Sequence, residues 1–153
     1  MKGRFRFPLA TVLQVARLRE EAARLRLAQA LARAALSRRA VEETQRLLAR
    51  RLAEMGEDAP LGRPPEEFLL RLRHLEQLNA AMAGWRDRLA QEEAEAEKER
   101  HHLLSRHRER RLLERLEEKA RARFRRELLK YLERETEATV LCRFPLWQRE
   151  DEG

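Results

Sequence analysis

The sequence predicts an all-α fold in which two long helices pair as an antiparallel coiled-coil hairpin. Charged residues make up 40% of the 153 residues and aromatic residues 5%, a composition typical of long helices with narrow apolar seams. Helix-breaking residues gather in the stretch 56–65, which holds three of the five prolines and two of the five glycines. Apolar residues recur at spacings of three and four on both sides of it. Together these observations predict a single hairpin over 1–153 with its tip at 57–65.

The first arm of the hairpin is predicted to run from about residue 8 to about residue 56. Pro8 suits the first turn of a helix, and no further glycine or proline occurs before Gly56. Apolar residues form two stripes that overlap around 25–36, so the contact face is expected to shift around the helix. One stripe comprises Val12, Val15, Leu18, Ala22, Leu25, Gln29, Ala32 and Leu36. The other comprises Leu27, Leu31, Ala34, Arg38, Val41, Gln45, Leu48, Leu52 and Met55.

The second arm is predicted to run from about residue 66 to about residue 140. Pro64 and Pro65 are followed by two glutamates, the residue types that a helix N-terminus favours. Gly84 costs about 1 kcal/mol relative to alanine but does not end a helix. Residues 141–153 are expected to form a C-terminal tail beyond the helix. The predicted seam comprises Phe68, Leu72, Leu75, Leu78, Met82, Trp85, Leu89, Leu103, Leu113, Leu116, Ala120, Phe124, Leu128 and Tyr131.

The position of the tip predicts which residues of the two arms face each other. If the chain folds back about Leu61, the numbers of facing residues sum to about 122–124. This register places Met55 opposite Phe68 and Leu48 opposite Leu75. The second arm then extends past the first by about 25 residues, and the N-terminal tail, another chain or water must cover this extension.

The positive charge is concentrated near the end of the second arm. Residues 100–134 contain 13 Lys and Arg against 6 Glu, a surplus that equals the net charge of +7 for the whole chain. Nucleic acid, an acidic protein surface and plain solvation are alternative explanations of this basic segment. The interleaved glutamates would oppose phosphate, which disfavours nucleic acid. A basic coiled coil that binds nucleic acid and a scaffold that dimerises through its arms remain alternatives.

The sequence contains no motif that predicts catalysis. A Gly-rich phosphate loop, a nucleophile elbow and a zinc pattern are absent, and His101, His102 and His107 lack the i, i+4 spacing of two metal ligands on one helix face. We therefore expect no enzymatic activity, no cofactor, no metal and no small-molecule substrate. Cys142 is the only cysteine, which excludes an intrachain disulfide and favours an intracellular protein.

Two groups of residues suit partner binding. His74, Leu78, Ala81 and Trp85 follow one another at spacings of four, three and four, so they share one helix face. This face is either core packing or a docking surface, for which tryptophan is a favoured anchor. The second group lies at the N-terminus, where Phe5 and Phe7 alternate with basic residues. They form either a frayed tail or an apolar anchor that folds back on a neighbouring helix.

Several segments together resemble the flagellar type III export protein FliJ family. The opening, Phe5-Arg6-Phe7-Pro8-Leu9-Ala10-Thr11-Val12-Leu13-Gln14-Val15-Ala16-Arg17, is similar to that family's alternating phenylalanines and leucine-rich start. The charged first arm, the central break and the basic second arm ending in Lys130-Tyr131-Leu132-Glu133-Arg134-Glu135 are also similar. The resemblance covers about residues 5–138. Gly84 and the apolar segment 141–147 depart from the family pattern.

The resemblance implies a two-helix stalk, similar to the rotor stalk of the rotary ATP synthase, without enzymatic activity. Its partners would be the hexameric flagellar export ATPase, the cytoplasmic domain of the export gate FlhA and export chaperones. The protein would lie in the cytoplasm, held at the inner face of the cell membrane through the export apparatus. The gate-binding residues would be His74, Leu78, Ala81 and Trp85. The residues toward the ATPase would be Phe5, Phe7, Arg121, Arg123, Phe124 and Arg125.

Overall fold

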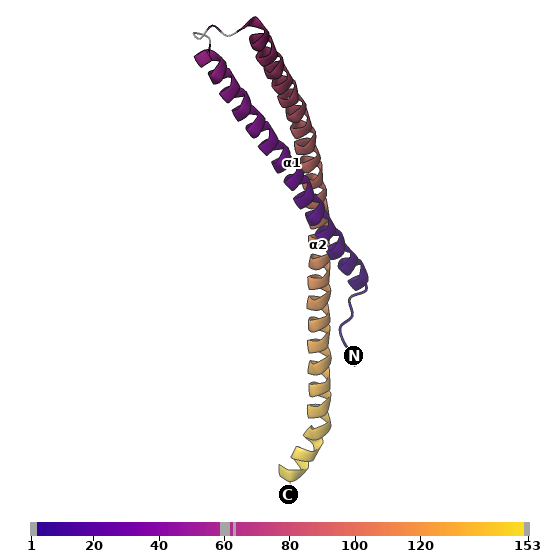
Figure 1. Cartoon of the computed structure of the whole chain (residues 1–153). Coiled ribbons are helices and arrows are strands. Elements are labelled where there is room, and N and C mark those ends of the chain that lie inside the picture. The colour runs from indigo at the N-terminus through magenta and orange to yellow at the C-terminus, as the bar shows by residue number, and fades with distance from the viewer. Residues whose placement is uncertain (1–2, 59–61, 63, 152–153) are drawn as a thin grey trace. The chain divides into compact units, whose positions relative to one another are not determined.

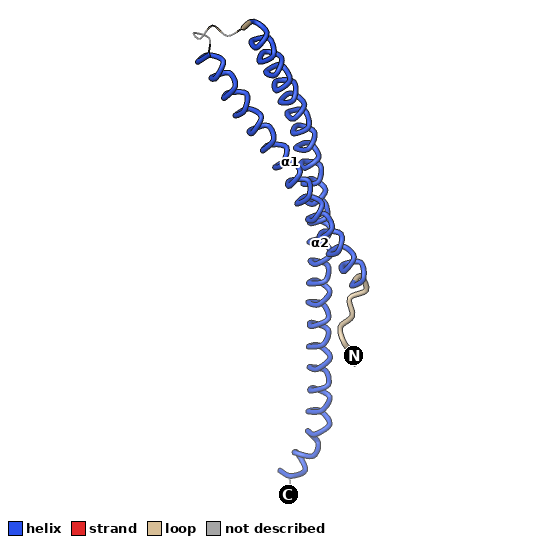
Figure 2. Tube along the Cα trace, in the orientation of Figure 1, coloured by secondary structure: helices blue, strands red, loops and turns tan. Residues whose placement is uncertain are grey.

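Two long α-helices make up almost all of the described chain, α1 (Ala10–Asp58) and α2 (Pro65–Asp151) (Figures 1 and 2). The structure, a computed structural model, describes residues 3–58, 62 and 64–151, except for the side chains of Asp58 and of 144–151. No strand occurs in these ranges. The prediction of an all-α fold with two long helices packed antiparallel is confirmed.

None of the described helical segments combines the length and the hydropathy of a membrane span.

Proline sets the start of α2. The carbonyl of Pro64 accepts hydrogen bonds from the N–H groups of Glu67 (3.1 Å) and Phe68 (3.3 Å), so Pro64 caps the helix and Pro65 occupies its first position. Proline fits there because a helix leaves its first N–H groups without partners. Glu66 and Glu67 then place negative charge in the first turn, where the helix dipole favours it. α2 thus begins one residue before the start predicted for the second arm.

Both helices extend beyond the ends predicted from the sequence. α1 continues through Gly56 to Asp58, and α2 continues past residue 140 to Asp151. A single glycine costs only about 1 kcal/mol in a helix, and no glycine or proline stands between Gly84 and Pro145. Neither predicted end therefore carries a strong stop signal. The apolar side chains predicted for the C-terminal tail at 144–147 lie outside the described side chains.

Between the two helices the chain reverses direction, as predicted. Gly62 has a φ of 61°, a left-handed conformation that glycine adopts at no steric cost. Ala59, Pro60, Leu61 and Arg63, which belong to the predicted tip, lie outside the described residues.

The described contacts divide the chain into two units. We name residues Glu20–Arg106, which include the turn, the tip unit. We name residues Met1–Arg19 together with His107–Gly153 the terminal unit. Each unit pairs a part of α1, or the segment before it, with a part of α2.

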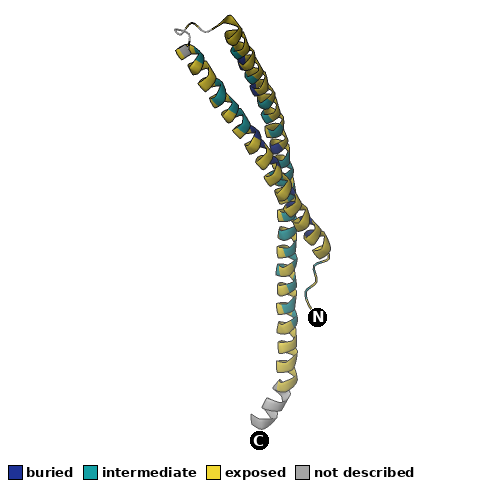
Figure 3. Cartoon of the chain, in the orientation of Figure 1, coloured by how far each residue is buried: buried dark blue, intermediate teal, exposed yellow. Residues whose placement is uncertain are grey.

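A regular seam of buried and half-buried residues joins the helices of the tip unit (Figure 3). Its residues follow each other at alternating spacings of three and four, the heptad pattern of a coiled coil. On α1 the seam comprises Glu20, Ala23, Leu27, Ala30, Ala34, Ser37, Val41, Thr44 and Leu48. On α2 it comprises Arg71, Leu75, Leu78, Met82, Trp85, Leu89, Glu92, Ala96, Glu99, Leu103 and Arg106.

The first stripe predicted on α1 is wrong, because the seam lies one or two residues further along the chain. Leu13 and Ala16 are buried, whereas Val12 and Val15 are 49% and 40% exposed. The second stripe is half correct. Ala34 and the stripe residues 27, 41 and 48, at multiples of seven from it, lie on the seam. Arg38 and the stripe residues 31, 45 and 52, at multiples of seven from it, are exposed. Because one seam persists along α1, the predicted shift of the contact face does not occur. Hydrophobicity misled the prediction because small and polar residues occupy much of the seam, while larger apolar residues flank it.

The seam predicted on α2 is largely correct. Leu75 and Met82 are buried, and Trp85, Leu113 and Phe124 are half-buried, as are most of the others. The predicted members that are exposed are Phe68, Leu72 and Leu116.

The predicted register is wrong by one heptad. In the tip unit, Ser37 bonds Glu92 and Arg38 pairs with Glu93, so the facing numbers sum to 129 and 131 rather than 122–124. A shift of seven residues leaves the same side chains on the seam, so the hydrophobic pattern does not distinguish the two registers. The observed register places Leu48 near Met82 rather than near Leu75. It also leaves the first turns of α2 beyond the end of α1.

Candidate functional site

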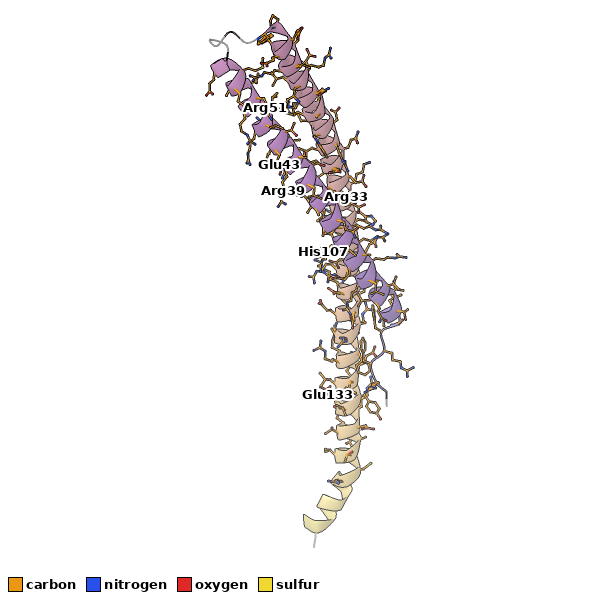
Figure 4. All side chains as sticks on the ribbon, viewed as in Figure 1. Arg33, Arg39, Glu43, Arg51, His107 and Glu133 are labelled. Atoms are coloured by element: carbon orange, nitrogen blue, oxygen red, sulfur yellow. The ribbon has the colours of Figure 1, made fainter. Side chains whose placement is uncertain are left out.

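The polar groups of the described residues lie mainly on helix surfaces. No group of three or more His, Cys, Asp and Glu side chains in the described ranges is placed to hold a metal ion. His101 lies 3.4 Å from Glu97 on an exposed helix face, and His107 lies 3.1 Å from Arg110. Charged side chains such as Arg39, Glu43 and Glu133 extend from the outer faces of the helices (Figure 4). The surfaces that present these groups are therefore the relevant sites.

The predicted gate-binding face lies at the edge of the tip-unit seam. Leu78 and Trp85 are half-buried seam residues, whereas His74 and Ala81 are exposed. The guanidinium carbon of Arg88 lies 5.4 Å from the centroid of the Trp85 ring, within the range of a cation–π contact. The four residues therefore share one face, of which half packs against α1 and half is available to a partner.

A pocket of about 260 Å³ lies beside this face, between the end of α1 and the start of α2. His74 lines it together with Arg51, Met55 and Leu75. His74, which belongs to the exposed half of the predicted face, therefore shares this pocket with residues near the end of α1. The sequence analysis did not indicate that α1 contributes to this surface.

An exposed apolar group at the start of α2 was missed by the sequence analysis. Phe68, Leu69 and Leu70 are 54%, 61% and 65% exposed. The one-heptad shift explains the exposure of Phe68 and Leu69, because they lie beyond the end of α1. Leu70 instead lines the pocket together with Arg51 and Met55 of α1. Three consecutive apolar residues do not fit on one face of a helix, and this signal was present in the sequence.

The predicted ATPase-facing residues mostly come together in the terminal unit. The rings of Phe5 and Phe124 are 5.6 Å apart at 56°, and the guanidinium carbon of Arg121 lies 5.3 Å from the Phe5 ring centroid. A shallow hollow of about 330 Å³ is lined by Phe5, Arg121, Phe124 and Arg125. The N-terminal segment is therefore an apolar anchor on α2, the second of the two alternatives that the sequence left open.

Two of the six predicted residues lie outside this hollow. Phe7 is half-buried and Arg123 is exposed, and neither lines the hollow. The contact between Phe5 and Phe124 covers only part of the predicted extension of α2. From Leu132 to Arg143 every residue of α2 is exposed.

Arginines surround the glutamates of the terminal unit. Glu114 accepts hydrogen bonds from Arg110 (2.7 Å) and Arg111 (3.3 Å), and Arg17 of α1 lies 3.7 Å away. The hydrogen bond from Arg110 is the largest cause that holds the pKa of Glu114 below its usual value. Arg121 similarly bonds Glu117 at 2.8 Å. Several basic residues of this unit are thus engaged with acids, and the surplus positive charge remains at the surface.

The fold and these two surfaces define a coiled-coil hairpin protein that presents a mixed apolar face near its turn and a basic aromatic face near its N-terminus. The family model described as Flagellar FliJ protein matches residues 5–136, and the chain belongs to that family. Membership gives it a role related to flagellar export and an association with the flagellar export apparatus. No curated protein and no solved structure matches the chain.

Proposed function

We propose that this protein is a stalk and adaptor without enzymatic activity in flagellar protein export. It promotes assembly and activity of the export ATPase hexamer, links the ATPase to the cytoplasmic domain of the export gate FlhA, and escorts export chaperones. The single observation that supports this most is the family match over residues 5–136. The two separate surfaces fit an adaptor, because each presents its own chemistry within its own unit.

The ATPase-facing surface in this proposal is the hollow of the terminal unit. Phe5 and Phe124 supply an apolar contact, while Arg121 and Arg125 supply positive charge. Aromatic and arginine side chains dominate many protein interfaces because they combine a large contact area with directed hydrogen bonds. An acidic surface on the partner would complement this positive charge.

Mixing the purified protein with its cognate export ATPase tests this part of the proposal. We expect a rise in ATP hydrolysis together with hexamer formation. An Arg123→Glu, Arg125→Glu variant reverses two exposed charges and should lower the stimulation severalfold. Arg39→Glu makes the same type of change at an exposed position of the tip unit and serves as the control. Absence of any stimulation by the unmodified protein would contradict the proposal.

The gate-facing surface in this proposal comprises His74, Leu78, Ala81 and Trp85. Ala81→Glu places a charge on the exposed half of the face and should weaken binding to the soluble gate domain about tenfold. Ala80→Glu changes an exposed neighbour on a different face and should leave binding unchanged. Equal effects of the two variants would show that the face does not carry the contact.

Trp85 requires a separate measurement because it is half-buried on the seam. Trp85→Ala should weaken gate binding and also lower the melting temperature, since the side chain packs at the edge of the seam. A comparison of binding and melting across both the Trp85 and Ala81 variants separates docking from stability. Loss of helicity in Trp85→Ala alone would place Trp85 in the core rather than on the docking surface.

A further inference from the structure

The two sides of the seam in the terminal unit differ in chemistry. On one side, Arg17 of α1 faces Glu114 of α2 at 3.7 Å, and Arg110 and Arg111 complete the ion-pair cluster. Charged residues beside the seam are the usual arrangement of a two-helix coiled coil. Ion pairs between charged side chains therefore cover this side of the seam, as in other two-helix coiled coils.

The opposite side of the same seam is apolar and open. Val12 and Val15 of α1 and Leu112 of α2 are 49%, 40% and 61% exposed. With Leu113 they line a shallow groove of about 460 Å³, which Arg19 and Glu109 also border. Leu116, which is 39% exposed, lies one helical turn after Leu112 on the same face. The helices thus carry apolar residues where a two-helix coiled coil places charges.

Such a pair of apolar faces beside a closed seam is the shape that a third amphipathic helix fills. The N-terminal segment does not supply that helix, because Phe5 packs on Phe124, about three turns further along α2 than Leu113. The groove is separate from the Phe5–Phe124 hollow and shares no residue with it.

The charges around the groove indicate the kind of helix that fits. On α2 the face that contains Leu112 and Leu116 continues after seven residues to Lys119 and Arg123. Arg19 continues the face of Val12 in the same way, and Glu109 is the single acid that lines the groove. A helix in the groove would therefore lie among more positive than negative charges.

A second copy of the chain would complement these charges poorly. The chain carries a net charge of +7, and residues 100–134 alone account for a surplus of that size. Like charges brought together across an interface oppose association. We infer that the groove formed by Val12, Val15, Leu112 and Leu113 binds an acidic amphipathic helix of another protein. This inference concerns a third surface and does not rest on the proposed function.

A synthetic peptide tests the inference directly. The probe is a fluorescein-labelled helical peptide of about three heptads, with leucine on its seam and glutamate beside it, added to the full chain and followed by fluorescence anisotropy. We expect saturable binding that weakens as salt increases. A peptide of the same design with lysine in place of glutamate should not bind.

Matched variants locate the binding site. The double variant Val15→Ser, Leu112→Ser removes apolar surface from the groove and should weaken peptide binding at least about tenfold. The control Leu25→Ser, Leu129→Ser removes two leucines outside the groove that are 61% and 59% exposed, against 40% and 61% for Val15 and Leu112. Since all four residues are exposed, circular dichroism should show unchanged melting. An equal loss in the control, or no binding by the unmodified chain, would overturn the inference.

A crosslinking measurement tests the inference even if the double variant has a lower melting temperature than the unmodified protein. Val15→Cys in a Cys142→Ser background, labelled with a benzophenone, should crosslink to the acidic peptide, whereas the same label at Leu129→Cys should not. Light scattering on the unmodified chain tests whether a second copy of the chain occupies the groove instead. If the unmodified chain is a dimer and the Val15→Ser, Leu112→Ser variant is a monomer, a second copy fills the groove. That result would overturn the inference.

Discussion

The tip unit contains two stretches of seam that are built from different residues. From Val41 to Leu48 on α1, and from Leu75 to Leu89 on α2, the seam consists mainly of large apolar side chains. From Glu20 to Ser37 on α1 it consists of three alanines, one leucine, one glutamate and one serine. We name these the large-residue stretch and the small-residue stretch.

The difference teaches how stability and register are divided along one coiled coil. Large apolar side chains bury more area and stabilise the pairing, but they tolerate a slip of one heptad. Small residues bring the helices close and admit polar pairs such as Ser37 with Glu92, at 2.6 Å. A slip would separate this pair and leave the buried serine without its partner. We therefore assign stability mainly to the first stretch and register mainly to the second.

The largest expected effect is the loss of a large seam residue. Met82→Ala should destabilise the protein by about 2–4 kcal/mol, because Met82 is buried and its removal leaves a cavity. Urea denaturation followed by circular dichroism measures the change. Leu132→Ala, at a position that is 49% exposed, is the control and should change the free energy of unfolding by less than about 0.5 kcal/mol. Similar losses in both variants would contradict the assignment.

The next effect comes from enlarging a small seam residue. The register places Ala34 opposite Ala96, and both are buried. Ala34→Leu should therefore push the helices apart and cost about 1–3 kcal/mol. Ala35→Leu adds the same atoms at an exposed position and should be nearly neutral. If Ala34→Leu proves neutral too, the helices do not approach closely in this stretch.

A third variant should stabilise the protein. Glu99 lies on the seam of α2, and its Oε2 atom is buried without a hydrogen-bond partner among the described residues. Glu99→Leu removes this desolvated oxygen and should raise the free energy of unfolding by about 1–2 kcal/mol. Glu97→Leu, at an exposed neighbour, controls for helix propensity and charge. A lower stability of Glu99→Leu would show that the carboxylate has a partner in solution.

The contrast between the two stretches also explains how far the sequence predicted the fold. The large-residue seam of α2 was identified because Leu75, Met82 and Trp85 repeat at coiled-coil spacing. The small-residue seam of α1 was misplaced because Ala23 and Ala30 carry less hydrophobic signal than the exposed leucines beside them. Burial in that stretch depends on close approach of the partner helix, which a single helix's pattern does not contain.

The candidate sites were predicted to different extents for the same reason. Spacing within one helix was enough to put Leu78 and Trp85 on one face. The contact of Phe5 with Phe124 and the groove beside Val12 depend on the register between segments far apart in the chain. The register is set by individual polar contacts rather than by the heptad pattern, so these two features needed the structure.

The smallest expected effect concerns the acid sensitivity of the small-residue stretch. The Ser37 hydroxyl donates to Glu92 and is the largest cause that holds the pKa of that carboxyl below its usual value near 4.5, with a further hydrogen bond from Arg88. A carboxyl whose pKa is lower in the folded state stabilises the fold above the unfolded pKa. This contribution is lost as the pH falls from about 4.5 through the lowered folded value.

Ser37→Ala should therefore lower stability at neutral pH and flatten the loss of stability between about pH 5 and pH 3. Urea midpoints measured across this range provide the comparison. Ser105→Ala removes a hydroxyl at an exposed position of α2 and should keep the acid dependence of the unmodified protein. The same acid dependence in Ser37→Ala would show that the serine does not hold Glu92 in its charged form. It would remove the main support for assigning register to this stretch, because the Ser37–Glu92 bond is the polar contact that distinguishes the two registers.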